Sequence, residues 1–129
     1  MQFLSSLASL LHDSRWRPAW RALLLLLMGI AAWFAFIPTT PSAQAGGVDK
    51  VEHLLAFAAL GMAAAFTTHS RLRDLVRAAA GLMLYGGFIE LVQTQLPTRQ
   101  GDWADMLADG IGVLAGLAFA AWLRAAVRR

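Results

Sequence analysis

Three short stretches of this chain place ionisable and amide side chains inside apolar sequence. FIELVQ, residues 88–93, contains Glu90 and Gln93, DKVEH spans 49–53, and DWADMLAD spans 102–109. Carboxylates and imidazoles are the groups that most often act as general acids and bases, and they also ligate divalent metals. Any shared chemistry depends on whether the fold brings the three stretches together.

The composition of the chain indicates a membrane protein. Of its 129 residues, 58% are hydrophobic, whereas a soluble domain has roughly 45–50%. Four stretches approach the roughly 20 apolar residues that a helix needs to cross a bilayer. They are residues 21–37, 51–68, 75–96 and 103–123. We therefore expect an all-α fold, an integral membrane bundle of four transmembrane helices, with 1–20 as an N-terminal segment and 21–129 as one transmembrane domain.

The basic residues predict how the bundle is oriented. Nine of the eleven Lys and Arg residues lie before the first span, around the second turn or after the fourth span, and only Lys50 and Arg99 fall on the other side. The positive-inside rule then places both termini in the cytoplasm and the first and third turns outside. Because the arginines flank spans instead of forming one patch, we expect no nucleic-acid partner. The absence of cysteine excludes thiol chemistry.

The segment before the first span is typical of a short amphipathic helix at the membrane interface. Apolar residues recur at helical spacing from Phe3 to Leu11, and Trp16 and Trp20 suit an aromatic belt. The sequence AQA at 43–45 has the form of a signal-peptidase site, and cleavage there would leave three spans. The long basic N-terminal region argues against cleavage, so we expect all four spans to be retained.

Antiparallel threading brings the polar ends of the second, third and fourth helices to the outer side. Asp49 and His53 are four residues apart and Glu90 and Gln93 are three apart, so each pair shares a helix face. A charge at the bilayer centre costs roughly 2.5–3.5 kcal/mol on insertion scales, so these side chains should face one another. Five acids lie there against three basic residues, counting the histidine. We expect at least one carboxyl to be protonated, to bind a cation or to contact a cationic ligand.

The predicted pocket residues divide by role. The candidate catalytic residues are Glu90, His53 and Asp109, because intramembrane acids are functional by default and histidine titrates near neutral pH. The other members of the pocket are Asp49, Lys50, Gln93, Arg99 and Asp105. Because Arg99 is expected in an exposed turn, its guanidinium could bind a phosphate or carboxylate group of a ligand. Alternatively, it only neutralises a neighbouring aspartate. Asp49 and Asp102 fit helix capping equally well.

Two further features leave alternatives open. A divalent metal fits the ligand types of the pocket, with zinc or manganese favoured by the imidazole, but the spacing demands no metal. The metal-ligating candidates are Asp49, His53, Glu90, Asp105 and Asp109. Small residues recur every four positions along the fourth helix, including Gly112 and Gly116, and would allow close packing either within the bundle or in a homo-oligomer.

The order and spacing of these motifs resemble the VanZ-like family of membrane proteins. DKVEH at 49–53 is similar to the family's D-K-x-x-H, ELVQ at 90–93 to its E-x-x-Q, and 99–112 to its R…D-x-x-x-N-x-x-G. Asp109 departs from the pattern, since the family commonly has Asn there. The resemblance implies a small helical protein of the bacterial cytoplasmic membrane, in some cases linked to glycopeptide tolerance, and implies no particular reaction.

Three functions follow as expectations. The first is binding, without catalysis, of a membrane lipid, a lipid-linked cell-wall precursor or a lipophilic glycopeptide at the outer leaflet. The second is a lipid-modifying enzyme with Glu90 or Asp109 as general base, His53 as acid or metal ligand, and Arg99 on a phosphate. The third is a small proton-coupled exporter working as a dimer, with Glu90 carrying the proton. The sequence leaves open whether the protein is an enzyme.

Overall fold

The computed structural model describes residues 2–38 and 47–127. Across these two ranges it contains helices and no strand. The elements are α1 (Gln2–His12), a short 3-10 helix η1 (Ser14–Trp16), α2 (Arg17–Phe36), α4 (Val48–Thr67), α5 (Leu72–Gln93) and α6 (Trp103–Val127). Four helices are long and apolar enough to cross a membrane. The predicted all-α fold with four spans is thus confirmed, while the AQA sequence lies outside the described residues.

Helix α2 lies at the outside of the bundle. Within Arg17–Phe36, all of which the structure describes, no residue is buried. The helix begins four residues earlier than predicted, because Pro18 fits the first turn of a helix, where its missing N–H costs nothing. It ends at Phe36, since Ile37 precedes a proline and takes an extended conformation.

The closest packing in the bundle is between α4 and α6. A Cβ atom added to Gly112 would lie 2.5 Å from the carbonyl oxygen of Leu54, and one added to Gly61 would lie 2.6 Å from that of Val113. Both distances are too short for any side chain, so the two backbones touch where the glycines lie. The small-residue face of α6 is therefore used within the bundle, against α4.

Helix α5 completes the core and ends earlier than predicted. Ile89 on α5 is buried together with Phe57 of α4 and Val113 of α6. The helix stops at Gln93, three residues short of the expected end, because a turn leads into Pro97, which cannot continue a helix. Glu90 consequently lies in the last turn of α5 and closer to the third turn of the chain than the sequence suggested.

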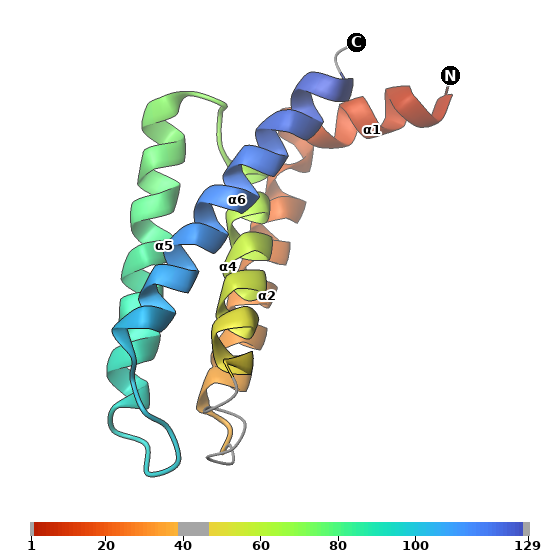
Figure 1. The fold of residues 1–129 in the computed structure, drawn as a ribbon. Coiled ribbons are helices and arrows are strands. Elements are labelled where there is room, and N and C mark those ends of the chain that lie inside the picture. Colours follow the sequence, from red (N-terminus) through yellow and green to blue (C-terminus); the bar gives the residue numbers. More distant parts are fainter. Residues whose placement is uncertain (1, 39–46, 128–129) are drawn as a thin grey trace.

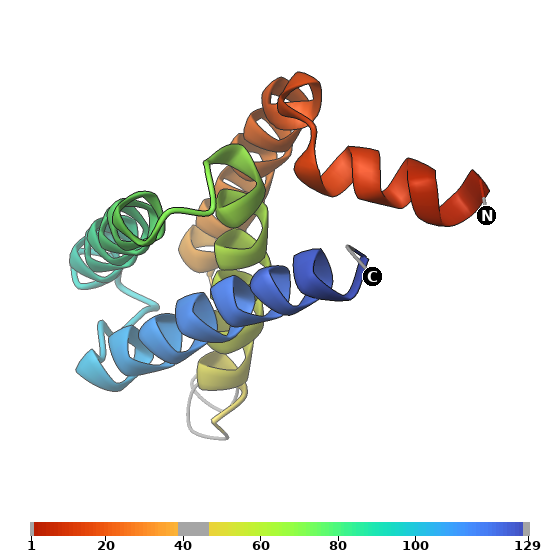
Figure 2. The same ribbon diagram turned by 90° about the horizontal axis from the view of Figure 1, so that it is seen from above.

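The N-terminal helix is held against the bundle by its carbonyl groups. Figure 2 shows α1 extending sideways from the start of α2, as a separate helix. Trp20 donates its indole N–H to the carbonyl of Leu10 at 3.0 Å, and Arg124 donates Nε–H to that of Leu11 at 3.2 Å. Two backbone acceptors at the end of α1 are thus satisfied by side chains of α2 and α6.

Both described ends of the chain lie at one end of the bundle. The ends of α1 and α6 lie there with the turn between α4 and α5, and the loop between α5 and α6 lies at the opposite end (Figure 1). This arrangement is the one expected for four antiparallel spans. Which end faces the cytoplasm stays a prediction from the distribution of arginines.

Candidate functional site

The three polar stretches meet at the end of the bundle opposite the chain termini. Asp49 and His53 lie in the first two turns of α4, Glu90 in the last turn of α5, and Asp105 and Asp109 near the start of α6. All except Asp49 are buried, and Asp109 is fully excluded from solvent. The fold thus brings together the carboxylates and the imidazole that the sequence singled out.

His53 lies between two carboxylates from different helices. Its Nδ1 is 2.8 Å from Asp109 Oδ1, and its Nε2 is 3.9 Å from Glu90 Oε1. An ionised carboxylate only accepts hydrogen bonds, so with Asp109 ionised and the imidazole neutral, Nδ1 carries the proton and Nε2 keeps a lone pair. Gly86 makes room for this pair, since a Cβ atom there would lie 2.5 Å from Asp109 Oδ2.

Asp102 fixes the start of α6 and joins it to α5. Its Oδ1 accepts a hydrogen bond from the N–H of Ala104 at 2.9 Å, and its own N–H donates to Glu90 Oε2 at 2.8 Å. Lys50 donates to Asp102 Oδ2 at 3.0 Å and lies 3.5 Å from Asp105 Oδ1. The Ala104 hydrogen bond, followed by that from Lys50, lowers the pKa of Asp102. Capping by Asp102 is confirmed.

Asp49 does not cap α4. The N-cap of that helix is Gly47, which takes a left-handed conformation with φ of 72° and makes no side-chain capping bond. Asp49 is the second residue of α4, in its first turn, and its carboxylate is 3.4 Å from the guanidinium of Arg99. The capping interpretation is therefore wrong for Asp49, whose side chain is left facing the pocket.

Arg99 is buried, contrary to its expected exposure, with 7% of its surface accessible. Its guanidinium donates to the carbonyl of Phe34 at 2.6 Å and to that of Ile37 at 3.2 Å. Gln93 donates its side-chain amide to the carbonyl of Ala35 at 3.1 Å. These carbonyl groups lie at the C-terminal end of α2, where no further helical N–H group is available to donate to them. A cation is also favourable at the negative end of the helix dipole. Two predicted pocket residues thus hold the end of α2.

Four buried oxygens of the site have no hydrogen-bond partner among the residues that the structure describes. They are Glu90 Oε1, Gln93 Oε1, Asp105 Oδ1 and Asp109 Oδ2. A buried polar atom left without a partner costs roughly 1–3 kcal/mol. Three of the four belong to carboxyl groups, so the site has more acceptors than donors.

A cavity of about 360 Å³ lies between α2 and α4 and leads to this site. Its apolar part is lined by Ile30 and Phe34 of α2 and Leu55 of α4, all of them exposed on the outside of the bundle. Its polar end is lined by Asp49, Glu52, His53 and Arg99. We call this cavity the α2–α4 groove. The contribution of α2 was not predicted, because this helix carries no charged side chain at this end.

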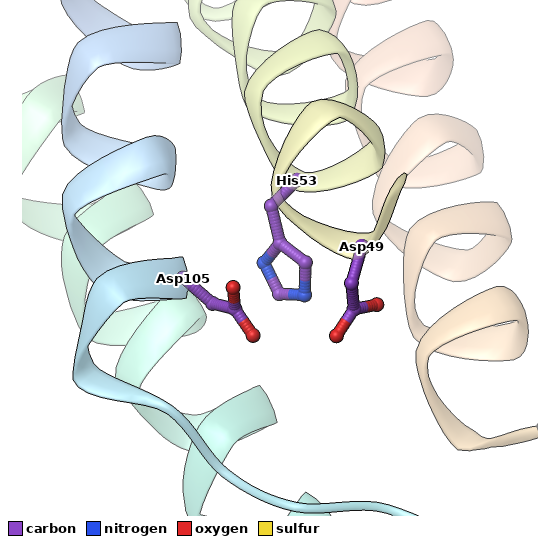
Figure 3. Close-up of side chains that lie close together, drawn as sticks. All are labelled: Asp49, His53 and Asp105. Carbon is purple, nitrogen blue, oxygen red and sulfur yellow. The ribbon is translucent and has the colours of Figure 1, made fainter. Parts of the chain in front are cut away.

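Three side chains come close enough to hold one metal ion. Asp49, His53 and Asp105 each offer one ligand atom, and these atoms lie within 4.8 Å of one another. In Figure 3 the imidazole of His53 lies between the two aspartates, one from its own helix and one from α6. Of the five metal-ligating candidates, these three lie close enough to bind the same ion. Asp109 is instead hydrogen-bonded to the Nδ1 atom of His53.

Comparison with known proteins assigns the chain to a family. No curated protein and no solved structure matches it significantly. The sequence model of the VanZ/LLP1 family matches residues 4–124, which is nearly the whole chain and includes every residue of the site. The helical membrane-spanning fold and the motif resemblance agree with this match. The protein therefore belongs to the VanZ/LLP1 family.

Proposed function

We propose that this protein binds a membrane amphiphile, with the acyl chains of the ligand in the α2–α4 groove and its head group at the acidic end. The observation that carries the proposal is the groove itself, in which apolar residues of α2 and α4 lead directly to Asp49 and His53. Ligand sites in proteins are typically concave, mostly apolar and supplied with a few convergent polar groups.

The position of the groove favours a ligand that enters from the bilayer. Phe34 and Leu55 line the groove and are 60% and 63% exposed, so its apolar part opens on the surface that lipid chains would cover. A ligand that enters from water would gain roughly 0.8 kcal/mol of binding free energy for each CH₂ group that it buries. A ligand that is already in the membrane does not gain this hydrophobic term. Its binding free energy would come from close packing in the groove and from the contacts of its head group.

The charge of the site favours a head group that donates hydrogen bonds. Arg99 is already bonded to two carbonyls and Asp49, and Lys50 to Asp102, so the cations nearby are engaged. Asp49 and Glu52 line the polar end of the groove and offer carboxylate oxygens that accept hydrogen bonds. An amine or several hydroxyls would donate to them. A cell-envelope lipid and a lipophilic glycopeptide both present such groups at the outer leaflet of a bacterial cytoplasmic membrane.

Photocrosslinking tests the binding function. A benzophenone amino acid in place of Phe34 would lie in the groove, and one in place of Phe119, which is also exposed but lies on α6 away from it, is the matched control. We expect irradiated membranes to yield one enriched lipid adduct from position 34 and only bulk phospholipid from 119. Identical adduct profiles from the two positions would contradict the proposal.

A lipid-modifying enzyme is a second candidate, favoured by the placement of His53. Its hydrogen bond to Asp109 at 2.8 Å orients the imidazole, and Glu90 lies on the other side. An oriented imidazole with a lone pair on Nε2 is equipped to act as a general base. Mass spectrometry of envelope lipids from a deletion strain, complemented with wild type or Glu90→Gln, separates the candidates. A lipid that accumulates and is corrected only by wild type supports an enzyme; unchanged lipids exclude it.

A further inference from the structure

We propose that Asp49, His53 and Asp105 form a binding site for a single divalent cation, zinc or manganese. This site goes beyond the proposed amphiphile binding and does not depend on it, because the groove could hold a ligand with or without a metal at its end. The three residues come from two helices, and their ligand atoms lie within 4.8 Å of one another.

The geometry needs only a small adjustment to fit a metal ion. Zinc bonds of about 2.0–2.2 Å to nitrogen and oxygen place neighbouring ligand atoms roughly 3.3–3.6 Å apart in a tetrahedron. The ligand atoms would draw together by about 1 Å, which side-chain rotation of the partly exposed Asp49 can supply. Figure 3 shows both carboxylates directed toward the space beside the His53 ring.

The buried carboxylates supply a second, independent indication of a ligand. Asp105 is 1% exposed, and its Oδ1 has no hydrogen-bond partner within the described ranges, with Lys50 at 3.5 Å. Glu90 Oε1 is likewise buried without a hydrogen bond and lies 3.9 Å from His53 Nε2. Buried carboxylate oxygens are normally satisfied, and a cation beside His53 would lie next to both of these.

Asp109 prepares His53 to act as a metal ligand. Histidines that bind metals almost always donate their other ring N–H to a carboxylate or a carbonyl, which fixes the ring and its tautomer. Asp109 Oδ1 takes this position at 2.8 Å from Nδ1 and is fully buried. Nε2 is therefore the nitrogen available for a metal.

The nearby cations leave room for an additional positive charge. Lys50 bonds Asp102 at 3.0 Å, closer than its 3.5 Å to Asp105, and remains paired with Asp102 when a metal takes Asp105. Arg99 lies 3.4 Å from one oxygen of Asp49, and its other bonds go to backbone carbonyls. Imidazole with carboxylates suits zinc and manganese better than calcium, which prefers oxygen ligands alone.

Metal titration of the purified full-length protein in detergent tests the site. After treatment with a chelator, the protein is titrated with zinc chloride or manganese chloride by calorimetry, and bound metal is counted by elemental mass spectrometry. We expect about one equivalent in the wild type. His53→Ala and Asp105→Asn should weaken binding by about a hundredfold or more. His69→Ala and Asp74→Asn, a histidine and an aspartate at the opposite end of the bundle, should bind like the wild type.

A measurement on the wild type alone keeps the proposal testable if the variants fold poorly. Manganese broadens the NMR signals of nearby nuclei, so substoichiometric manganese should broaden the His53 imidazole signal and spare those of His12 and His69. Equal broadening of all three histidines, no tight equivalent of either metal, or His53→Ala binding metal as tightly as the wild type would each overturn the site.

Discussion

The guanidinium of Arg99 donates a 2.6 Å hydrogen bond to the carbonyl oxygen of Phe34, joining the loop before α6 to the end of α2. The same side chain reaches Ile37 and Asp49. One wall of the α2–α4 groove is therefore held in place by a residue from its polar end. This arrangement couples the stability of α2 to the integrity of the candidate site.

Arg99→Ala should destabilise the protein and loosen α2. The substitution leaves two carbonyls and the Asp49 carboxylate without their donor, and hydrogen bonds to a charged group are worth about 1.5–3 kcal/mol each. Because these losses are not additive, we expect a decrease of about 3–5 kcal/mol in unfolding free energy, the usual cost of removing one partner of a buried ion pair, measured by denaturant titration in detergent. Arg73→Ala, at an exposed position, is the control and should change stability little. Equal stability of the two variants would show that the α2 end does not depend on Arg99.

Arg124 has the corresponding role at the other end of the bundle. It is 8% exposed and donates to the carbonyls of Leu11 and Ala65 at 3.2 and 3.1 Å, and its guanidinium lies 4.9 Å from the Phe66 ring centroid. Arg124→Ala should loosen α1 before it unfolds the bundle, because the substitution removes one of the two side chains that bind the carbonyl groups at the end of α1. Spin labels on α1 and α6 would then report longer and broader distances. Unchanged distances, with Arg73→Ala as reference, would contradict this role.

The convergence of the polar stretches was predictable, but the assembly of the groove was not. Glu90, His53 and Asp105 lie on helix faces that antiparallel spans must bring to one end, so helical periodicity and topology were enough. The position of Phe34 in the wall of the groove depends on the hydrogen bond that Arg99 donates to its carbonyl oxygen. These two residues are 65 positions apart, so no local sequence pattern predicts that they pair.

The burial of two arginines at helix ends was not predicted from the sequence. An arginine near a membrane boundary is usually taken as an indicator of membrane topology. Arg124 was therefore grouped with the charges that flank the spans, and Arg99 was expected to be exposed in a turn. Both are buried because helix ends leave backbone carbonyls without partners, and in a membrane protein water cannot satisfy all of them. Small-residue spacing predicted the close packing of α6, but only the structure identifies α4 as its partner.

Gly116→Ala should weaken the α4–α6 contact. A Cβ atom at Gly116 would collide with the backbone of Ala58, so the helices must move apart. Overpacking of this kind costs about 1–3 kcal/mol. Gly29→Ala is the matched control, because nothing lies within 4 Å of the added atom on α2, and alanine is the better helix former. Thermal unfolding in detergent should rank Gly29→Ala at or above the wild type and Gly116→Ala below it; the reverse ranking would contradict backbone contact between α4 and α6.

Asp109→Asn should preserve the fold and weaken metal binding. Asparagine retains an oxygen that can accept from His53 Nδ1, so the ring keeps its orientation, while the substitution removes a charge from a fully buried position. A neutral partner polarises the imidazole less than a carboxylate does, and changes at such positions typically cost about 10–100-fold in metal affinity. Asp109→Leu removes the hydrogen bond altogether and should cost more than Asp109→Asn. Metal titration combined with the NMR signal of His53 measures both effects. If both variants bind metal like the wild type, Asp109 does not position His53 for metal binding.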